Sequence, residues 1–193
     1  MSTAQEIKRI AREECGADLV GIASVDRFAG LPPEANPSAI QPDARSVIVL
    51  GFSIPRGGLR GVEAGMAWST FNLSLPFGSI MTEGTYLLCR ALESEGWEAT
   101  PLHPQSPNLR HQGVRVSPDK PEPNVIVDLV YAAHAAGLGE LGRGKLFLTP
   151  EFGPRQVFTA VLTDAPLDAD APFRGSICDD CGACAEACPS RAL

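Results

Sequence analysis

The most constraining feature of the chain is a run of four cysteines near its C-terminal end. Of six cysteines, four lie within the last sixteen of 193 residues, in the order Cys178-Asp-Asp-Cys181-Gly-Ala-Cys184-Ala-Glu-Ala-Cys188-Pro. Evenly spread cysteines would suggest a secreted scaffold stapled by disulfides, whereas this crowding indicates metal or cluster ligation. The spacing C-x2-C-x2-C-x3-C-P is that of the bacterial ferredoxin run, which binds an iron–sulfur cluster.

Two other interpretations of the run are weaker. A zinc site usually takes two well-separated pairs of ligands, and a disulfide is disfavoured in a reducing compartment. The small residues Gly182 and Ala183 would let the loop wrap its thiolates around a [4Fe-4S] cluster. We therefore predict a ligand set for such a cluster that consists of Cys178, Cys181, Cys184 and Cys188.

The run does not by itself complete a cluster. In two-cluster proteins the fourth cysteine ligates the other cluster, so Cys188 would belong to a second cluster and the first would lack one ligand. Cys15 and Cys89 lie in stretches predicted as helices. The simpler interpretation of both is a buried small hydrophobic residue. The source of the missing ligands stays open, and one hypothesis is that the chain is incomplete.

Composition and charge exclude several classes of protein. A hydrophobic content of 44% is that of a folded chain, and a net charge of −7 with dispersed Lys and Arg argues against nucleic acid as a partner. No apolar run approaches the length of about 20 residues that a membrane span needs. The first sixteen residues carry charges throughout and lack the apolar segment of a signal peptide. We expect a cytoplasmic protein that does not enter a membrane.

Hydrophobic periodicity predicts an α+β fold, a mixed α/β sandwich, because helices and strands alternate irregularly. The stretch 46–54 is continuously apolar and should be a strand buried on both faces. The predicted domains are a core over 1–165 and, over 166–193, a linker with a partial ferredoxin-like segment. Residues 59–78 are ambiguous. The other predicted elements are helices at 3–14, 79–95 and 124–136, strands at 18–25, 145–149 and 156–163, loops at 26–44 and 100–123, and a polar linker at 164–177.

The centre of the chain contains an unusual glycine-rich stretch. Gly137, Gly139, Gly142 and Gly144 lie close together, and Arg143 and Lys145 add positive charge. Its letters match the dinucleotide-binding pattern GxGxxG, but that pattern needs a strand before it and a helix after it, and here the predicted order is reversed. Two interpretations remain: a cradle for an anionic or bulky cofactor, or a structural turn from helix to strand.

Together these segments resemble a known family. Ala-Gly-Leu-Gly-Glu-Leu-Gly-Arg, Leu-Thr-Pro-Glu-Phe-Gly-Pro-Arg, Leu-Thr-Asp-Ala-Pro-Leu and the cysteine run follow one another within 132–193. This order resembles the epoxyqueuosine reductase and reductive dehalogenase group of cobalamin-dependent iron–sulfur proteins. The resemblance implies a nitroreductase-like core that carries cobalamin, and a ferredoxin-like tail that delivers electrons to it. The implied cofactor-binding residues are Gly137, Gly139, Glu140, Gly142, Arg143, Thr149, Glu151 and Arg155.

The sequence departs from that group in three ways: one cysteine run, a shorter chain, and an acidic balance that disfavours a tRNA substrate. It also lacks a twin-arginine signal. The first hypothesis is a reductase-like redox protein that acts on a small substrate, and the second is a non-enzymatic electron-transfer or corrinoid-binding module. Expected partners are an electron-donor protein or small-molecule reductant, with homo-oligomerisation open. Tyr86, Tyr131 and His134 are more simply packing residues than catalytic ones.

Overall fold

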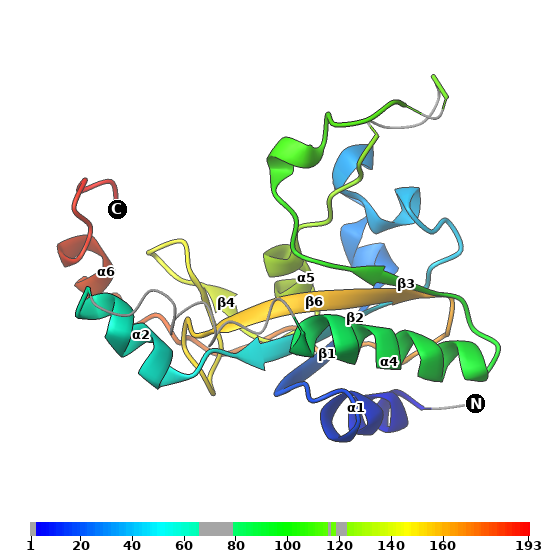
Figure 1. Ribbon diagram of the computed structural model, residues 1–193, viewed down its shortest axis with the longest axis horizontal. Helices are drawn as coiled ribbons and strands as arrows, with labels where there is room; N and C mark the ends of the chain where they lie inside the picture. Colours follow the sequence, from blue (N-terminus) through cyan, green and yellow to red (C-terminus); the bar gives the residue numbers. More distant parts are fainter. Residues whose placement is uncertain (1–2, 66–78, 116, 119–122) are drawn as a thin grey trace.

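The computed structural model describes residues 3–65, 79–115, 117–118 and 123–193, and is built around one four-stranded antiparallel sheet (Figure 1). The strand order is β1 (Leu19–Ser24), β2 (Ser46–Ser53), β6 (Gln156–Thr163) and β3 (Ala99–Leu102). Every neighbouring pair is antiparallel, and the central pair β2–β6 is in register over its full length, from Ser46 opposite Thr163 to Ser53 opposite Gln156. The sheet therefore has β1 and β3 as its edge strands.

Both faces of the sheet are covered, which explains the continuous apolar sequence of β2. On one face pack α1 (Ala4–Glu13) and α4 (Ile80–Ser94), whereas α5 (Leu129–Ala135) and a small hairpin, β4 (Glu140–Leu141) with β5 (Phe147–Leu148), lie on the other (Figure 1). Side chains of a strand alternate between faces. Ile48 and Leu50 join the α1–α4 cluster, while Val47 and Val49 join the α5 cluster. The predicted mixed sandwich with a strand buried on both faces is confirmed.

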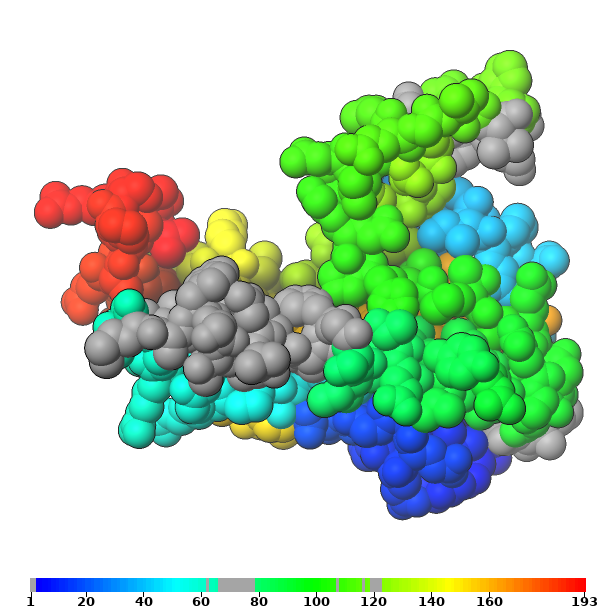
Figure 2. Space-filling model, viewed as in Figure 1, coloured from blue at the N-terminus to red at the C-terminus, as the bar shows by residue number. Residues whose placement is uncertain are grey.

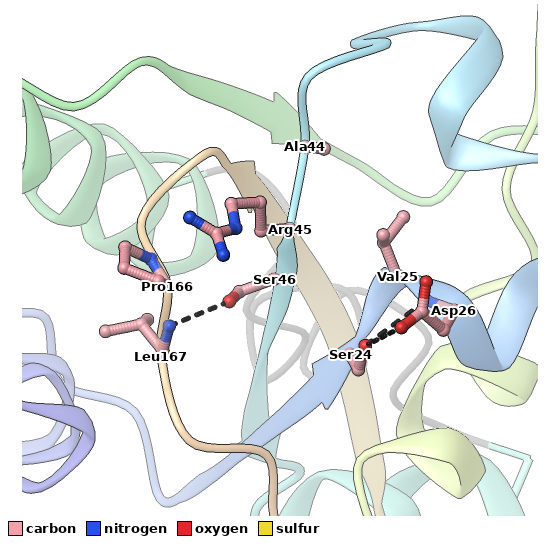
Figure 3. A pocket seen from close by; sticks show the side chains of 8 residues that line it. All are labelled: Ser24, Val25, Asp26, Ala44, Arg45, Ser46, Pro166 and Leu167. Atoms are coloured by element: carbon pink, nitrogen blue, oxygen red, sulfur yellow. Dashed lines mark hydrogen bonds between the residues drawn. The ribbon is translucent and has the colours of Figure 1, made fainter.

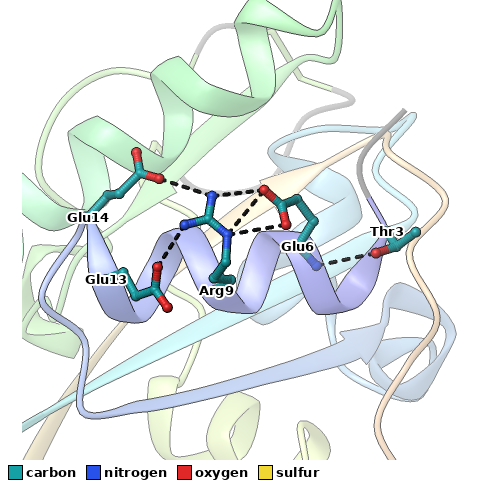
Figure 4. A network of polar contacts seen from close by, with 5 residues as sticks. All are labelled: Thr3, Glu6, Arg9, Glu13 and Glu14. Atoms are coloured by element: carbon teal, nitrogen blue, oxygen red, sulfur yellow. Dashed lines mark hydrogen bonds and ion pairs between the residues drawn. The ribbon is translucent and has the colours of Figure 1, made fainter.

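Helix α1 shows how the sequence specifies its position. The Thr3 hydroxyl accepts a hydrogen bond from the Glu6 backbone N–H, as an N-cap does, and Ile7 and Ala11 are buried against the sheet. On the exposed side, Arg9 pairs with the carboxylates of Glu6, Glu13 and Glu14 (Figure 4). Such surface pairs contribute little individually, so the buried face holds this helix in place.

The two isolated cysteines are core residues, as predicted. Cys15 and Cys89 are 4% and 8% exposed, and both belong to the cluster between the sheet and the α1–α4 layer. A Cβ atom at Gly84 would lie 2.4 Å from the carbonyl oxygen of Cys15, so only glycine allows α4 to approach this closely. Burial raises the pKa of each thiol to about 11. Both thiols are therefore neutral and shielded.

Several predicted boundaries are wrong, for identifiable reasons. The helix predicted at 124–136 covers only Leu129–Ala135, because Asp128 caps the backbone N–H groups of Val130 and Tyr131 and so sets the start of the helix. The strand predicted at 145–149 is shortened to β5, because Lys145 lies in the preceding hairpin turn with a φ of 61° and Thr149 forms only an isolated bridge with Gly153 in the turn that follows. The predicted loop beginning at Thr100 starts within a strand, since β3 pairs with β6 and its Pro101 is tolerated at the sheet edge.

The structure also contains short elements that the sequence analysis did not predict. Part of the ambiguous region forms a helix, α2, and residues 66–78 lie outside the described residues. The predicted loop at 26–44 contains three single turns of 3-10 helix, and the C-terminal run contains one turn of α-helix, α6. Their bounds are Arg56–Glu63 for α2, Val25–Phe28, Pro33–Ala35 and Pro37–Ala39 for the three turns, Pro107–Leu109 for a fourth, and Ala183–Glu186 for α6.

The segment predicted as a linker lies against the core along the free edge of β1. The Asp170 backbone N–H donates to the carbonyl of Ile22 at 2.8 Å, and the Asp170 carboxylate accepts from the Ile22 N–H at 2.8 Å. The same carboxylate pairs with Lys8 of α1, and the Asp170 carbonyl accepts from Arg27 at 2.7 Å. These contacts fix the path of the chain toward the cysteine run. Within the described residues, no helix is long and apolar enough to span a membrane.

Candidate functional site

The cysteine run forms a loop followed by the single turn α6, at one end of the molecule (Figure 1). Asp180 and Gly182 both adopt left-handed backbone angles, with φ of 60° and 80°, which curls the chain on both sides of the second cysteine, Cys181. Cys181 is exposed and the other three thiols of the run are partly exposed. In the part of the chain that the structure describes, no three Cys, His, Asp or Glu side chains converge as a metal site.

Cys188, the last cysteine of the run, contacts the residues that follow it. Its sulfur lies 3.4 Å from the Ser190 hydroxyl and accepts from the Ala192 backbone N–H at 3.4 Å. The Ser190 contact, followed by that of Ala192, lowers the pKa of the Cys188 thiol, because hydrogen bonds to sulfur favour the thiolate. The thiolate is the form that binds iron, so this donor set suits a cluster.

The β4–β5 hairpin holds the cysteine run against the core. One carboxylate oxygen of Glu140 accepts hydrogen bonds from the backbone N–H groups of Ile177 and Cys178, at 2.5 and 2.7 Å. These bonds, that of Cys178 first, lower the pKa of Glu140, and the carboxylate stays ionised at neutral pH. The first cysteine of the run is thereby tied to β4.

Two further contacts join the same hairpin to the run. The Arg143 guanidinium donates to the Asp180 carboxylate at 2.7 Å, and it interacts electrostatically with the thiols of Cys184 and Cys178. Gly144 faces Cys184 so closely that a Cβ atom there would lie 2.8 Å from the Cys184 Cβ and 3.3 Å from its sulfur. The absence of a side chain at Gly144 therefore leaves the space that Cys184 occupies.

Beside the hairpin lies a mostly apolar cleft that runs along the start of α5. Its first part, of about 310 Å³, lies between the hairpin and the loop after β3, and its second part, of about 540 Å³, continues beneath that loop. Figure 2 shows the hollow between the hairpin residues and the arm that follows β3. Pro104, Leu129 and Val130 line both parts, so the two hollows adjoin at these residues, and we refer to them together as the cleft. The first part is also lined by Lys145, Leu146, Phe147, Pro154, Gln156, Val157 and Phe158.

Polar groups are few within this cleft, and one has no partner. Arg110 lines the second part, and its Nε atom is buried without a hydrogen-bond partner among the described residues. Leu146 and Val130 are 56% and 38% exposed although they are apolar. Mostly apolar walls with a few polar groups are common in ligand sites, and a buried polar atom without a partner, such as the Arg110 Nε, calls for an explanation.

None of the eight residues predicted to contact a cofactor is among those that line the cleft. Gly137, Gly139 and Gly142 allow close backbone packing, the first against Ala171 and the other two against Leu148. Thr149 is buried, and its hydroxyl bonds to Gln156 and to the backbone N–H of Phe152. The remaining four are Glu140 and Arg143, which hold the cysteine run, Glu151, which is exposed, and Arg155, which donates to the Ile54 carbonyl.

Sequence reasoning missed the cleft-lining residues, although a signal was present. Leu146 and Phe147 directly follow the glycine-rich stretch, and apolar residues beside such a stretch could have indicated a ligand wall. Tyr131 also lines the cleft, but its ring packs edge-on against Phe28 and its hydroxyl donates to the Arg27 carbonyl at 2.8 Å. His134 contacts the Gly139 carbonyl at 3.2 Å. Both contacts agree with the predicted packing roles.

A second, polar cavity of about 380 Å³ lies at the opposite end of the sheet, where β1 ends and β2 begins. Its walls include Arg45, Ser46 and Leu167, and the Ser46 hydroxyl accepts from the Leu167 N–H at 3.2 Å (Figure 3). The same hydroxyl donates to the Ala165 carbonyl at 2.8 Å. These bonds fasten the chain after β6, so the serine acts structurally here.

Comparison with known protein families shows which class of domain the C-terminal segment is similar to. The family of 4Fe-4S binding domains matches residues 173–193, the segment that contains all four cysteines of the run. The chain therefore carries an iron–sulfur-binding segment at the C-terminal end of a mixed α/β fold. The predicted [4Fe-4S] class is supported by this match.

Particular relatives confirm the resemblance to both groups of reductases. The tetrachloroethene reductive dehalogenase of Sulfurospirillum multivorans is 29% identical over 167 residues, which are 84% of this chain and 29% of that protein. The epoxyqueuosine reductase of Synechococcus sp. (strain CC9605) is 44% identical over 61 residues, which are 32% of this chain and 19% of that protein. The chain thus spans less than a third of the length of these relatives.

Solved structures of both groups share the fold. The catabolic reductive dehalogenase NpRdhA superposes with a TM-score of 0.70 at 21% identity, covering 98% of this chain and 25% of that one. The epoxyqueuosine reductase of Streptococcus thermophilus superposes with a TM-score of 0.68 at 17% identity, covering all of this chain and 54% of that one. The core and the tail together thus correspond to part of a reductase.

Proposed function

We propose that this protein is a reductase-like iron–sulfur redox protein. In this proposal a [4Fe-4S] cluster on the cysteine run passes electrons to a cobalamin in the adjoining cleft, and from there to a small substrate. The observation that carries the proposal is the shared hairpin: β4–β5 holds the cysteine run on one side and lines the cleft on the other. Part of the proposal is that the core, a sheet between helical layers, is nitroreductase-like.

The residues present fit a corrinoid. One structural neighbour is described by the words "a mechanism for B12-dependent dehalogenation". A corrinoid is a broad, flat ring with an apolar face and a polar rim, and the cleft offers apolar walls with Arg110 and Lys145 at its margins. When bound, such a group supplies a strongly reducing cobalt centre. Leu146, Phe147 and Val130 would exclude water from its face, and the buried Nε of Arg110 would gain a hydrogen-bond partner.

The cluster proposal is tested by iron binding. After anaerobic reconstitution with ferrous iron and sulfide, the wild-type protein is expected to hold iron and sulfide and to absorb broadly near ~400 nm, as thiolate-ligated clusters do. Cys178→Ser should lose iron while the fold persists, because the cysteine run contributes none of the buried core residues. Wild-type protein without iron, or a Cys178→Ser variant with unchanged iron, would rule out the assignment.

The cleft proposal is tested by cobalamin binding. Leu146→Glu places a charge on the cleft wall and should weaken hydroxocobalamin binding in equilibrium dialysis by roughly tenfold or more, since an apolar contact is replaced by a buried charge. Its matched control is Ile80→Glu on α4, because Ile80 is an apolar residue of similar exposure, 52% against 56%. Equal cobalamin binding by the two variants would show that cobalamin does not bind in this cleft.

A second function is an electron-transfer or corrinoid-binding module without catalysis of its own, which needs only the cysteine run and the cleft that the β4–β5 hairpin joins. Either function requires an electron donor, a protein or a small reductant, and places the thiolate ligands in a reducing compartment such as the cytoplasm. Reduction of a bound corrinoid by dithionite-reduced cluster, with no turnover of organohalide or epoxide, would support the module.

A further inference from the structure

The β4–β5 hairpin contacts the cysteine run at three points. Each contact is made to a residue within 178–184, the part of the run that contains its first three cysteines. Glu140 bonds the backbone of Cys178, Arg143 pairs with Asp180, and Gly144 accommodates Cys184. The contacts thus follow the loop from its first ligand residue to its third. Of these three contacts, the Glu140 contact is the one in which an ionised side chain accepts hydrogen bonds from backbone N–H groups.

The two Glu140 bonds differ from ordinary surface contacts. Hydrogen bonds from backbone N–H groups to a carboxylate are charge-assisted, and both converge on one oxygen, at 2.5 and 2.7 Å. Ile177 and Glu140 are half-buried, so water competes less with this contact than at an open surface. The bonds fix the direction in which the chain enters the run, because successive N–H groups can point at one acceptor only in a curled backbone.

We infer that Glu140 is a positioning residue for the cluster: its carboxylate orients Cys178 toward the iron and sets the placement of the cluster relative to the cleft. This inference rests on the proposed cluster function. The same carboxylate also brings a negative charge to the first ligand of the cluster. Hydrogen bonding and charge around the sulfurs are the means by which a protein tunes a cluster's reduction potential.

Two variants separate the geometric contribution of Glu140 from its charge. Glu140→Ala removes both bonds, and reconstituted protein should lose iron to a chelator roughly 10- to 100-fold more readily, the usual effect of removing such an outer partner. Glu140→Gln keeps an oxygen where both bonds are accepted. It should therefore retain iron like the wild type, while its midpoint potential in a redox titration rises because the negative charge is gone.

A matched control and two further measurements make the outcome decisive. Glu98→Ala removes an exposed carboxylate beside β3 and should change neither iron retention nor potential. Circular dichroism should show the same melting temperature for all variants, within about 2 °C, because the cysteine run that Glu140 contacts contributes none of the buried core residues. Amide hydrogen exchange in iron-free protein should accelerate at Ile177 and Cys178 in Glu140→Ala alone.

Each failure has a distinct meaning. If wild-type protein takes up no cluster, the proposed function is refuted, and the role of Glu140 toward a cluster is refuted with it. If the wild type holds a cluster and Glu140→Ala holds it equally well, the inference is overturned while the proposed function stands. A fall in iron that merely follows a lower melting temperature would also overturn it, since Glu140 would then support the fold and not the ligand.

Discussion

Replacing Asp170 tests whether the segment before the cysteine run is fastened to the core. In Asp170→Ala the N–H of Ile22, a residue with no exposed surface, loses its acceptor. An unsatisfied buried donor costs about 1–3 kcal/mol. The lost pair with Lys8 adds up to about 1 kcal/mol, because both partners are partly exposed, at 21% and 31%. We expect a loss of about 2–3 kcal/mol, which lowers the melting temperature of a chain of this size by roughly 5–10 °C.

Two companion variants assign the loss to its source. Asp170→Asn keeps an oxygen for the Ile22 N–H and removes only the charge, and Lys8→Met removes only the ion pair. Both should lower the melting temperature in circular dichroism by no more than about 3 °C. Limited proteolysis of Asp170→Ala should also cut within 166–177 earlier than in the wild type. If all three variants melt together, the hydrogen bond from the Ile22 N–H to the Asp170 carboxylate contributes nothing and the reasoning fails.

Three more outcomes follow from particular residues. Alkylation of iron-free native protein with iodoacetamide at pH 8 should modify the cysteine run and spare Cys15 and Cys89. At a pKa of about 11, the fraction of these two thiols that is ionised is small. Six modified cysteines in mass spectrometry, without unfolding, would contradict this. Because folding raises these two pKa values, their contribution to stability should be constant below pH 9 and disappear as the pH rises toward 11, which urea unfolding at several pH values would measure. Gly144→Ala should lower iron retention, because the added Cβ would clash with Cys184. Gly30→Ala should not, because a Cβ at Gly30 meets nothing within 4 Å. Equal iron content in the two variants would show that the run does not need this close approach.

The strands of the core could be predicted from sequence because burial leaves a local signal. The continuous apolar run of β2 indicated a strand covered on both faces, and the structure places α4 on one side and α5 on the other. The order of the strands could not be predicted, since it depends on which distant residues pair. Strand β3 was missed for the same reason: Pro101 argues against a strand unless the strand lies at an edge.

The candidate site was predicted in part, and the division has a physical cause. The spacing of the cysteines is a local property, so the ligands of the run could be proposed from sequence alone. The contact between Glu140 and the backbone of Cys178 joins residues 38 positions apart, and no pattern within either segment indicates it. The sequence left two interpretations of the glycines open, a cofactor cradle and a structural turn; the close contacts of Gly137 with Ala171 and of Gly144 with Cys184 depend on distant segments and could not be predicted from it.

The course of residues 166–177 along β1 also bears on how such a protein can be divided. A strand edge with free N–H and C=O groups is a template for pairing with other chains. In this protein Asp170 occupies that edge at Ile22 through both its backbone and its side chain. Cutting the chain after Ala165 would therefore remove more than the cysteine run: it would also expose the backbone groups of β1 that Asp170 now contacts. The segment that leads to the cysteine run thus also covers part of a strand edge that could otherwise pair with another chain.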